Sequence, residues 1–208
     1  EIRDIVRYAA DRHVEIVPEI DLPGHMLAAL AAYPELGCTG GPYETGTRWG
    51  VYDDVLCAGK EEVYEFLEGV FSEIVALFPG RYIHIGGDEC PKTRWKSCPD
   101  CQAFIRSHGI VSQGKRTREE QLQSYMMSQI SDFLGKHGRK VIGWDEILEG
   151  GGVKSATIMS WRGTQGGVDA ARNGWDAIMV PYQYLYLDYA QSRDEGEPLS
   201  IGGYLPLS

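Results

Sequence analysis

The sequence lacks any long apolar run. None of its 208 residues lies in a hydrophobic stretch near the roughly 18 residues that a membrane-spanning helix needs. Internal repeats and low-complexity linkers are also missing, which excludes solenoids and other repeat arrays. Hydrophobic residues make up 43% of the chain, enough for one substantial core. We therefore expect a globular domain without a membrane span.

Positive charge is scarce. Lys and Arg number 20 against 30 Asp and Glu, which gives a formal net charge of −10 and a pI near 5.0. An acidic surface repels polyanions, so the composition argues against nucleic acid or an anionic membrane surface as a partner. A neutral or cationic ligand suits this chain better.

Cysteines are few and odd in number. Of the five, Cys90, Cys98 and Cys101 lie close in sequence, and Cys98 and Cys101 form a C-x-x-C pair. The simpler interpretation is a local disulfide or buried thiols. The alternative is a structural zinc site, which would need a fourth ligand such as His84 or His108. The redox compartment and the metal state of these cysteines stay open.

Apolar periodicity alternates between strand and helix along the chain. Short apolar strands separated by helices are typical of parallel βα units, in either a doubly wound sheet or a (β/α)₈ barrel. Residues 37–59 are glycine-rich and are expected to form a loop over a site. The expected helices cover residues 1–12, 26–33, 61–78, 98–108, 117–137 and 164–173, and the expected strands 14–21, 81–86, 140–144, 156–161 and 176–182.

Polar and aromatic residues follow each of the five strands. In a barrel the carboxyl ends of all strands meet at one mouth, whereas an open sheet gathers ligand groups at one switch point. This distribution favours an α/β (β/α)₈ TIM barrel, with about five of its eight strands present. The residues concerned are Glu19, Asp21 and His25, then Asp88 and Glu89, then Trp144, Asp145 and Glu146, then Trp161 and Arg162, and finally Tyr182, Tyr186 and Asp188.

The segment RYIHIGGDEC contains the two adjacent acids that are the candidate catalytic residues. Adjacent side chains of a strand point to opposite faces, so only a bend at Gly86 and Gly87 brings both Asp88 and Glu89 toward one cavity. Neighbouring acids come from one side of a pocket and cannot flank a sugar, as the two carboxylates of ordinary retaining glycosidases do. They can serve a substrate whose own C2 acetamido group attacks the anomeric carbon, with one acid orienting the amide and the other protonating the leaving oxygen.

Other rim residues fit a sugar site. Trp144 and Trp161 could wall an acetamido group, the Tyr186 hydroxyl could hold its carbonyl, and Asp188 could bind a sugar hydroxyl. His25, hydrogen-bonded to Glu89, could tune the pKa of that acid. For Arg162 we expect a structural role, paired with one of the carboxylates.

Five segments together resemble glycoside hydrolase family 20, the β-N-acetylhexosaminidases. They are EIDLPGH at 19–25, HIGGDE at 84–89, GWDEIL at 143–148, MSWRG at 159–163 and YLDY at 186–189. The resemblance implies a (β/α)₈ catalytic domain, of which residues 1–208 form the central part, and substrate-assisted, retaining removal of terminal β-linked GlcNAc or GalNAc. No cofactor and no metal is implied.

The resemblance also implies roles at matching positions. Asp88 would orient the acetamido group and Glu89 would be the general acid/base, with His25 as its partner. The substrate-binding residues would be Trp144, Trp161, Tyr186 and Asp188. The parent enzyme is expected to be secreted or periplasmic and to act on glycans containing N-acetylhexosamine, whereas residues 1–208 alone are expected to self-associate.

Two other function classes stay open. A non-catalytic sugar-binding module on the same scaffold is one, although such a module does not need an acid with a raised pKa. A metal-dependent hydrolase that uses His25, His84 and the acids is the other, but no H-E-x-x-H or similar ligand spacing supports it. The preference between GlcNAc and GalNAc, the natural glycan and the oligomeric state are not set by these patterns.

Overall fold

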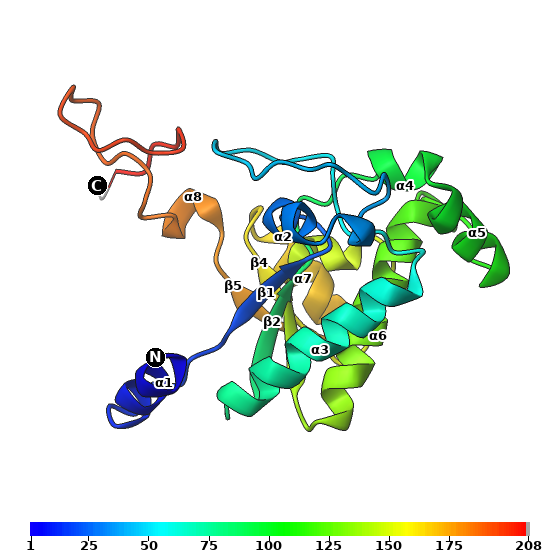
Figure 1. Cartoon of the computed structure of the whole chain (residues 1–208). Helices are drawn as coiled ribbons and strands as arrows, with labels where there is room; N and C mark the ends of the chain where they lie inside the picture. The colour runs from blue at the N-terminus through cyan, green and yellow to red at the C-terminus, as the bar shows by residue number, and fades with distance from the viewer. Residues whose placement is uncertain (207–208) are drawn as a thin grey trace.

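A five-stranded parallel sheet organises the chain (Figure 1). The computed structural model describes residues 1–206. The strands are β1 (Glu19–Leu22), β2 (Tyr82–Gly86), β3 (Lys140–Trp144), β4 (Thr157–Ser160) and β5 (Asp176–Met179), and each pairs in parallel with the next in chain order. The order β1-β2-β3-β4-β5 contains no reversal, so these strands have no switch point of the kind found in a doubly wound sheet. The arrangement is part of the wall of an α/β barrel, as predicted.

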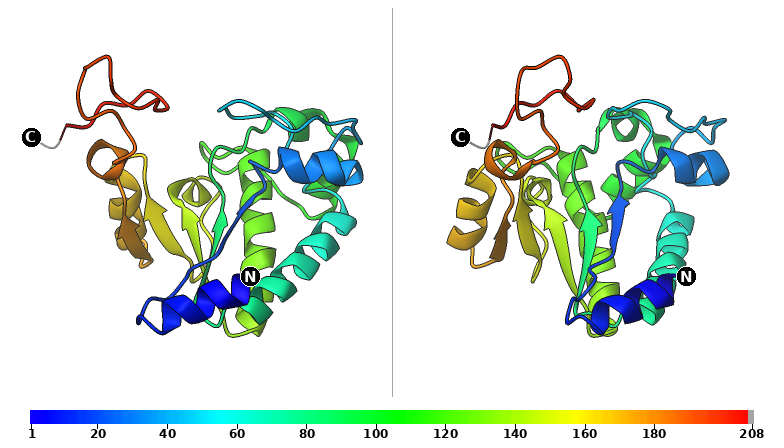
Figure 2. Two further views of the ribbon diagram at one scale, coloured as in Figure 1. Left: turned by 60° about the vertical axis from the view of Figure 1, so that its left-hand side comes forward. Right: turned by 90° about the vertical axis from the view of Figure 1, so that its left-hand side faces the viewer.

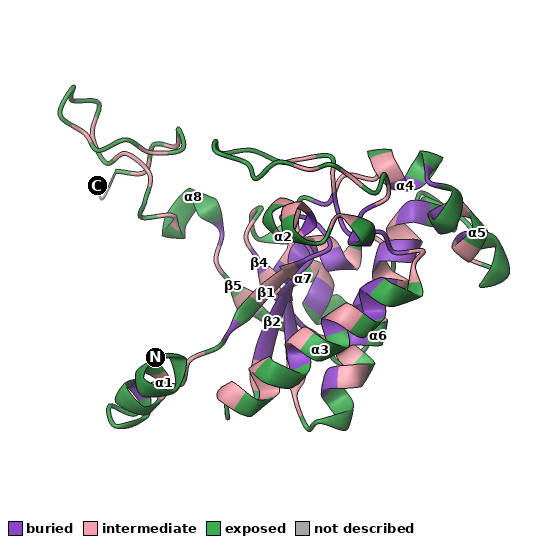
Figure 3. Ribbon diagram, in the orientation of Figure 1, coloured by how far each residue is buried: buried purple, intermediate pink, exposed green. Residues whose placement is uncertain are grey.

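Long amphipathic helices cover the sheet. Helix α3 (Glu61–Leu77) follows β1, α6 (Arg118–Lys136) follows β2, and α7 (Gln165–Arg172) follows β4. Helix α6 begins with a capping box, in which Thr117 and Glu120 each accept from the other's backbone N–H. Buried side chains of these helices and of the strands form one apolar core, drawn in purple in Figure 3.

The shorter elements gather at the carboxyl ends of the strands. They are α2 (Leu27–Ala32), η1 (Pro34–Leu36), α4 (Thr93–Ser97), α5 (Pro99–Ser107), η2 (Asp145–Leu148) and α8 (Tyr182–Leu185). Figure 2 shows the loop between η1 and α3 and the segment after α8 at this same end. The first helix, α1 (Ile2–Ala10), lies near the opposite end, and Ala9 is its one buried residue.

Two strand predictions need correction. The first strand begins at Glu19 rather than at residue 14, so Glu19 and Asp21 lie within β1 and do not follow it. Pro18 accepts a hydrogen bond from the His84 N–H (2.9 Å) but has no amide hydrogen with which to continue the ladder. The last strand ends at Met179, because Pro181 precedes α8.

Across residues 1–206, each helix is too short or too polar to pass through a lipid bilayer.

Candidate active site

The expected bend is present at the end of β2. Gly86 and Gly87 have φ values of +65° and +101°, and Glu89 has φ +44°. These left-handed conformations are accessible to glycine and uncommon for a glutamate. The bend ends the strand's alternation, so the adjacent side chains of Asp88 and Glu89 both reach the mouth of the barrel.

Close packing leaves no room for side chains at the two glycines. A Cβ at Gly86 would collide with the Asp21 carboxylate, and one at Gly87 would collide with Ile147. The Gly87 carbonyl accepts a hydrogen bond from Gln123 Nε2 on α6 (2.7 Å), and its N–H donates to Asp21 Oδ1 (3.3 Å). Three elements of the barrel therefore fix the backbone just before the two acids.

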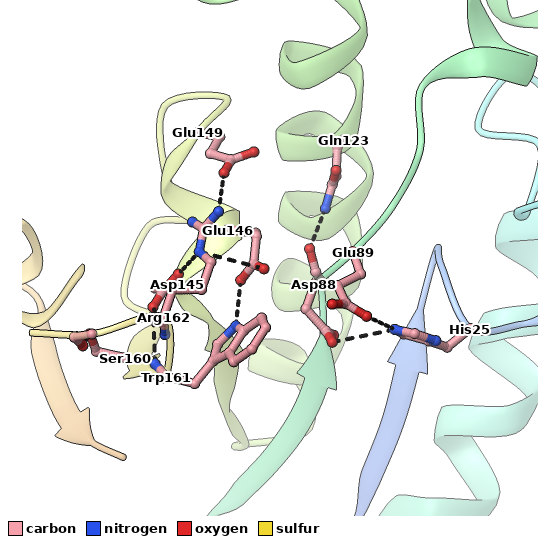
Figure 4. A network of polar contacts seen from close by, with 12 residues as sticks. His25, Asp88, Glu89, Gln123, Asp145, Glu146, Glu149, Ser160, Trp161 and Arg162 are labelled. Carbon is pink, nitrogen blue, oxygen red and sulfur yellow. Dashed lines mark hydrogen bonds and ion pairs between the residues drawn. The ribbon is translucent and has the colours of Figure 1, made fainter. Parts of the chain in front are cut away.

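His25 bridges the carboxylates (Figure 4). Its Nε2 lies 3.4 Å from Asp88 Oδ2 and 3.3 Å from Glu89 Oε2. The Asp88 side chain is 15% exposed and the Glu89 side chain 38%, so Asp88 is the more enclosed acid. The predicted contact between His25 and Glu89 is present, and His25 contacts Asp88 as well.

Asp21 belongs to the same cluster, and sequence reasoning gave it no role. Burial raises the pKa of Asp21 to about 8, and the neighbouring Asp88 adds to this shift by charge repulsion and by a hydrogen bond. The raised pKa favours the protonated form of Asp21 at neutral pH, and this form can donate to Asp88. Asp88 Oδ1 is buried and no N–H or hydroxyl group of the described residues donates to it, which is consistent with a carboxylic acid as its partner. In the sequence, Asp21 stood out only as one of the polar residues expected to follow the first strand.

A cavity of about 750 Å³ opens beside the acids. Of the four residues predicted to bind substrate, Trp144, Trp161 and Tyr186 line it, whereas Asp188 is exposed and is not part of the lining. The complete lining within the described residues is Asp88, Glu89, Trp144, Trp161, Tyr182, Gln183, Tyr186, Tyr189, Ile201, Gly202, Gly203 and Tyr204.

Carboxylates hold both indole rings in place. Trp144 Nε1 donates to Glu19 Oε1 (3.0 Å), and Trp161 Nε1 donates to Glu146 Oε2 (2.9 Å). A hydrogen bond from His84 lowers the pKa of Glu19, whereas burial raises the pKa of Glu146 to about 7. These two bonds fix the orientation of the indole rings beside the cavity.

The hydroxyl of Tyr186 stays protonated at neutral pH. Burial raises its pKa to about 12, so it can donate a hydrogen bond into the cavity. The ring of Tyr186 lies nearly parallel to that of Trp161, at 19° and with centroids 6.2 Å apart.

Arg162 pairs with carboxylates, as expected. Its guanidinium pairs with the buried Asp145 and with Glu149 (Figure 4), while Asp145 also accepts the backbone N–H groups of Trp161 and Arg162 (3.0 and 3.2 Å). This network fixes the turn that carries Trp161. None of its bonds reaches Asp88 or Glu89.

Two groups of side chains in residues 1–206 have spacings suited to a metal ion. Asp21, His25 and Asp88 form one. The other contains Cys38, Cys57, Cys98 and Cys101.

The cysteine cluster expected from the sequence needs correction. All five cysteines are free, and Cys90 lies apart from Cys98 and Cys101. Neither histidine considered as a fourth ligand joins the group, because His84 contacts Glu19 and His108 stacks on Phe104. Instead, Cys38 and Cys57, from the loop that precedes α3, lie beside Cys98 and Cys101.

Adjacent carboxylates at the carboxyl edge of a curved parallel sheet, beside a cavity walled by indole and phenol rings, are typical of a glycoside hydrolase barrel. The sequence model "Glycosyl hydrolase family 20, catalytic domain" matches residues 1–207. The chain belongs to this family.

Similar proteins carry related names. The chain is 51% identical to a beta-hexosaminidase of Porphyromonas gingivalis over all its residues, which are 26% of that protein's length. An exo-β-N-acetylglucosaminidase from Vibrio harveyi, solved with N-acetylglucosamine, superposes with a TM-score of 0.84 at 35% identity, over 99% of this chain and 32% of the other. A chitobiase from Flavobacterium johnsoniae gives 0.81 at 36% identity, over 96% and 32%. The chain thus spans about a quarter to a third of the length of these relatives.

Proposed function

We propose that the protein containing this chain removes terminal β-linked N-acetylhexosamine from glycans, with the acetamido group of the substrate as the nucleophile. The observation that carries the proposal is the placement of Asp88 and Glu89 on one wall of an aromatic cavity, bridged by His25. The names of the relatives support the same substrate class.

The geometry favours an internal nucleophile. A retaining glycosidase with its own nucleophile needs a second carboxylate across the sugar, about 5 Å from the acid. Among the described residues that line the cavity, Asp88 and Glu89 are the only carboxylates, and they are neighbours in the chain. The substrate's acetamido oxygen would supply the missing nucleophile.

Each acid then has a distinct task. Asp88, enclosed and supported by the Asp21 proton, would orient the acetamido N–H and stabilise the positive charge of the cyclised intermediate. Glu89, the more exposed acid, would protonate the leaving oxygen and later remove a proton from the attacking water. The breaking of the glycosidic bond is thereby matched by formation of the ring bond on the opposite face of the sugar.

The aromatic walls would select the acetamido group. Trp144 and Trp161 present indole faces whose N–H groups are already bonded to Glu19 and Glu146, so the rings offer apolar surface to a methyl group. The protonated Tyr186 hydroxyl would donate to the acetamido carbonyl.

Hydrolysis of aryl glycosides by the full-length protein tests the proposal. We expect release of the aryl alcohol from the β-N-acetylglucosaminide and very little from the matching β-glucoside, which lacks the nucleophile. Equal rates on both would contradict substrate assistance. Binding of N-acetylglucosamine without hydrolysis of either substrate would indicate a sugar-binding module instead.

A further inference from the structure

Four cysteine sulfurs converge at one point away from the cavity. Cys38, Cys57, Cys98 and Cys101 each offer a sulfur, and the four sulfurs all lie within 4.8 Å of one another. The separations of Cys57 from Cys101 and from Cys98 are 3.5 and 3.7 Å, and that of Cys38 from Cys101 is 3.9 Å. None of the four belongs to the lining of the site cavity.

These separations match the edges of a tetrahedron around one metal ion. A Zn–S distance of about 2.3 Å places neighbouring sulfurs of a tetrahedral site about 3.8 Å apart. We propose that Cys38, Cys57, Cys98 and Cys101 bind one zinc ion as a closed, structural site.

Burial supports a closed site. The side chains of Cys57 and Cys101 are fully buried, Cys98 is 4% exposed and Cys38 is half-buried. Four protein ligands leave no open position for water, which is typical of structural rather than catalytic zinc. Lys60, which donates to the Gly37 carbonyl (2.9 Å), places a positive charge near the two negative charges that zinc and four thiolates would carry together.

The backbone around the sulfurs is built as two close loops. Gly37 and Leu56 form an antiparallel bridge, so Cys38 and Cys57 come from paired segments. Cys98 and Cys101 flank the first turn of α5, which Pro99 begins. A Cβ at Gly59 would collide with the backbone of Asp100 and Cys101, so the two ligand loops touch without side chains between them.

The zinc ion would connect two regions of the barrel mouth. The 37–57 loop precedes α3, and Cys98 ends the segment that leads on from Glu89. Two other contacts join the same regions: Trp95 Nε1 donates to the Leu56 carbonyl (2.9 Å), and Arg94 pairs with Asp54 (2.7 Å). Zinc would add the strongest restraint of the three, because metal binding free energy contributes directly to folding.

Metal content of the full-length protein tests the site. We expect about one zinc per chain, falling below about 0.1 in Cys57→Ser and Cys98→Ser, because a structural site rarely survives the loss of one of its four ligands. Cys90→Ser is the matched control, because Cys90 is also buried but lies outside the cluster, and it should keep its zinc. Equal zinc in all of these proteins would overturn the assignment.

Measurements on the wild-type protein keep the test independent of how the variants fold. Cobalt taken up in place of zinc should give the intense visible and sulfur-to-metal absorption bands of tetrahedral thiolate coordination. Iron in place of zinc would overturn the choice of metal. Two results would overturn the site itself. One is a mass of the denatured protein that is lower by the hydrogens lost when disulfides form. The other is protein that contains no metal and whose cysteine thiols all react after denaturation.

Proteolysis tests the structural role. Removing zinc with a strong chelator should raise the rate of tryptic cleavage at Arg48 in the 37–57 loop severalfold, because the loop would lose its anchor. Cleavage at Arg116, which is also exposed but lies in a different loop, should not change. Unchanged cleavage at Arg48 after verified loss of the metal would contradict the restraint.

Discussion

Replacing Asp21 by Asn would separate two properties of this buried side chain, its hydrogen bonds and its ionisation. The Asn oxygen can still accept from the Gly87 N–H, and its amide can still donate toward Asp88. Asn cannot ionise, so the substitution removes the titration with a pKa of about 8.

The expected fall of kcat/KM at alkaline pH follows from the pKa of Asp21. At pH 9, one unit above it, about a tenth of the molecules keep the Asp21 proton, so kcat/KM of the wild-type protein should fall about tenfold from its plateau. The value of kcat/KM should fall as pH rises, because ionised Asp21 places a second negative charge beside Asp88 and no longer donates a hydrogen bond to it. Asp21→Asn should stay near its plateau through this range, until another group titrates.

The assay is kcat/KM between pH 6 and 10 on an aryl β-N-acetylglucosaminide with the full-length protein. Asp169→Asn on α7 is a matched control, because the Asp169 side chain is 47% exposed and lies outside the site, and its profile should follow the wild type. Superimposable alkaline limbs in Asp21→Asn and the wild type would refute the assignment of the proton to Asp21.

Stability should respond to the same group. The folded pKa of Asp21 is raised above its ordinary value of 3.8, so its contribution is fully present below pH 3.8 and is lost as pH rises to about 8. The loss is at most about 1.4 kcal/mol per pH unit. Denaturant midpoints measured at pH 5 and pH 7 should therefore differ more in the wild type than in Asp21→Asn, and equal differences would count against a buried, protonated Asp21.

Three further predictions follow from the site and the sheet. Glu89→Gln should cut turnover strongly on substrates with poor leaving groups and much less on activated aryl glycosides, whereas Asp88→Asn should harm both; matching behaviour would contradict the division of labour. Gly86→Ala should lower the free energy of unfolding by about 2–4 kcal/mol, because backbone strain and a collision with Asp21 both destabilise the folded state. Gly138→Ala should lower it by only about 1 kcal/mol, because Gly138 is at φ +72° but a Cβ there would meet no other atom. Residues 1–208 purified alone should self-associate through the free edges of β1 and β5, and sedimentation as a stable monomer would contradict this.

Local pattern was sufficient to predict the parallel βα architecture. Strand and helix periods differ, so the helices α3 and α6 lie where the sequence predicted them, although the buried residues of α3 include Tyr64 and Phe71, which were not expected to face inward. The ends of the first and last strands were wrong, because Pro18 and Pro181 stop a ladder that apolar residues alone would continue. The bend at Gly86 and Gly87 was predictable, because adjacent side chains of a strand point to opposite faces and only a bend brings both acids toward one cavity.

Contacts between distant segments could not be predicted from the sequence. The charge state of Asp21 depends on its burial against Asp88, which is distant in the chain but follows the strand that pairs with β1 in the sheet. The position of Asp188 outside the cavity lining depends on the path of the chain after α8.

The cysteines show most clearly which contacts the sequence alone could not predict. Sequence spacing determined that Cys98 and Cys101 lie together, since two intervening residues keep them within one turn, and it suggested Cys90 as their neighbour. Only the tertiary structure replaced Cys90 by Cys38 and Cys57, because a loop that precedes α3 folds back onto the start of α5 at Gly59. Sequence fixes which residues can be neighbours along one element, whereas the packing of elements decides which side chains from separate loops meet at a single point.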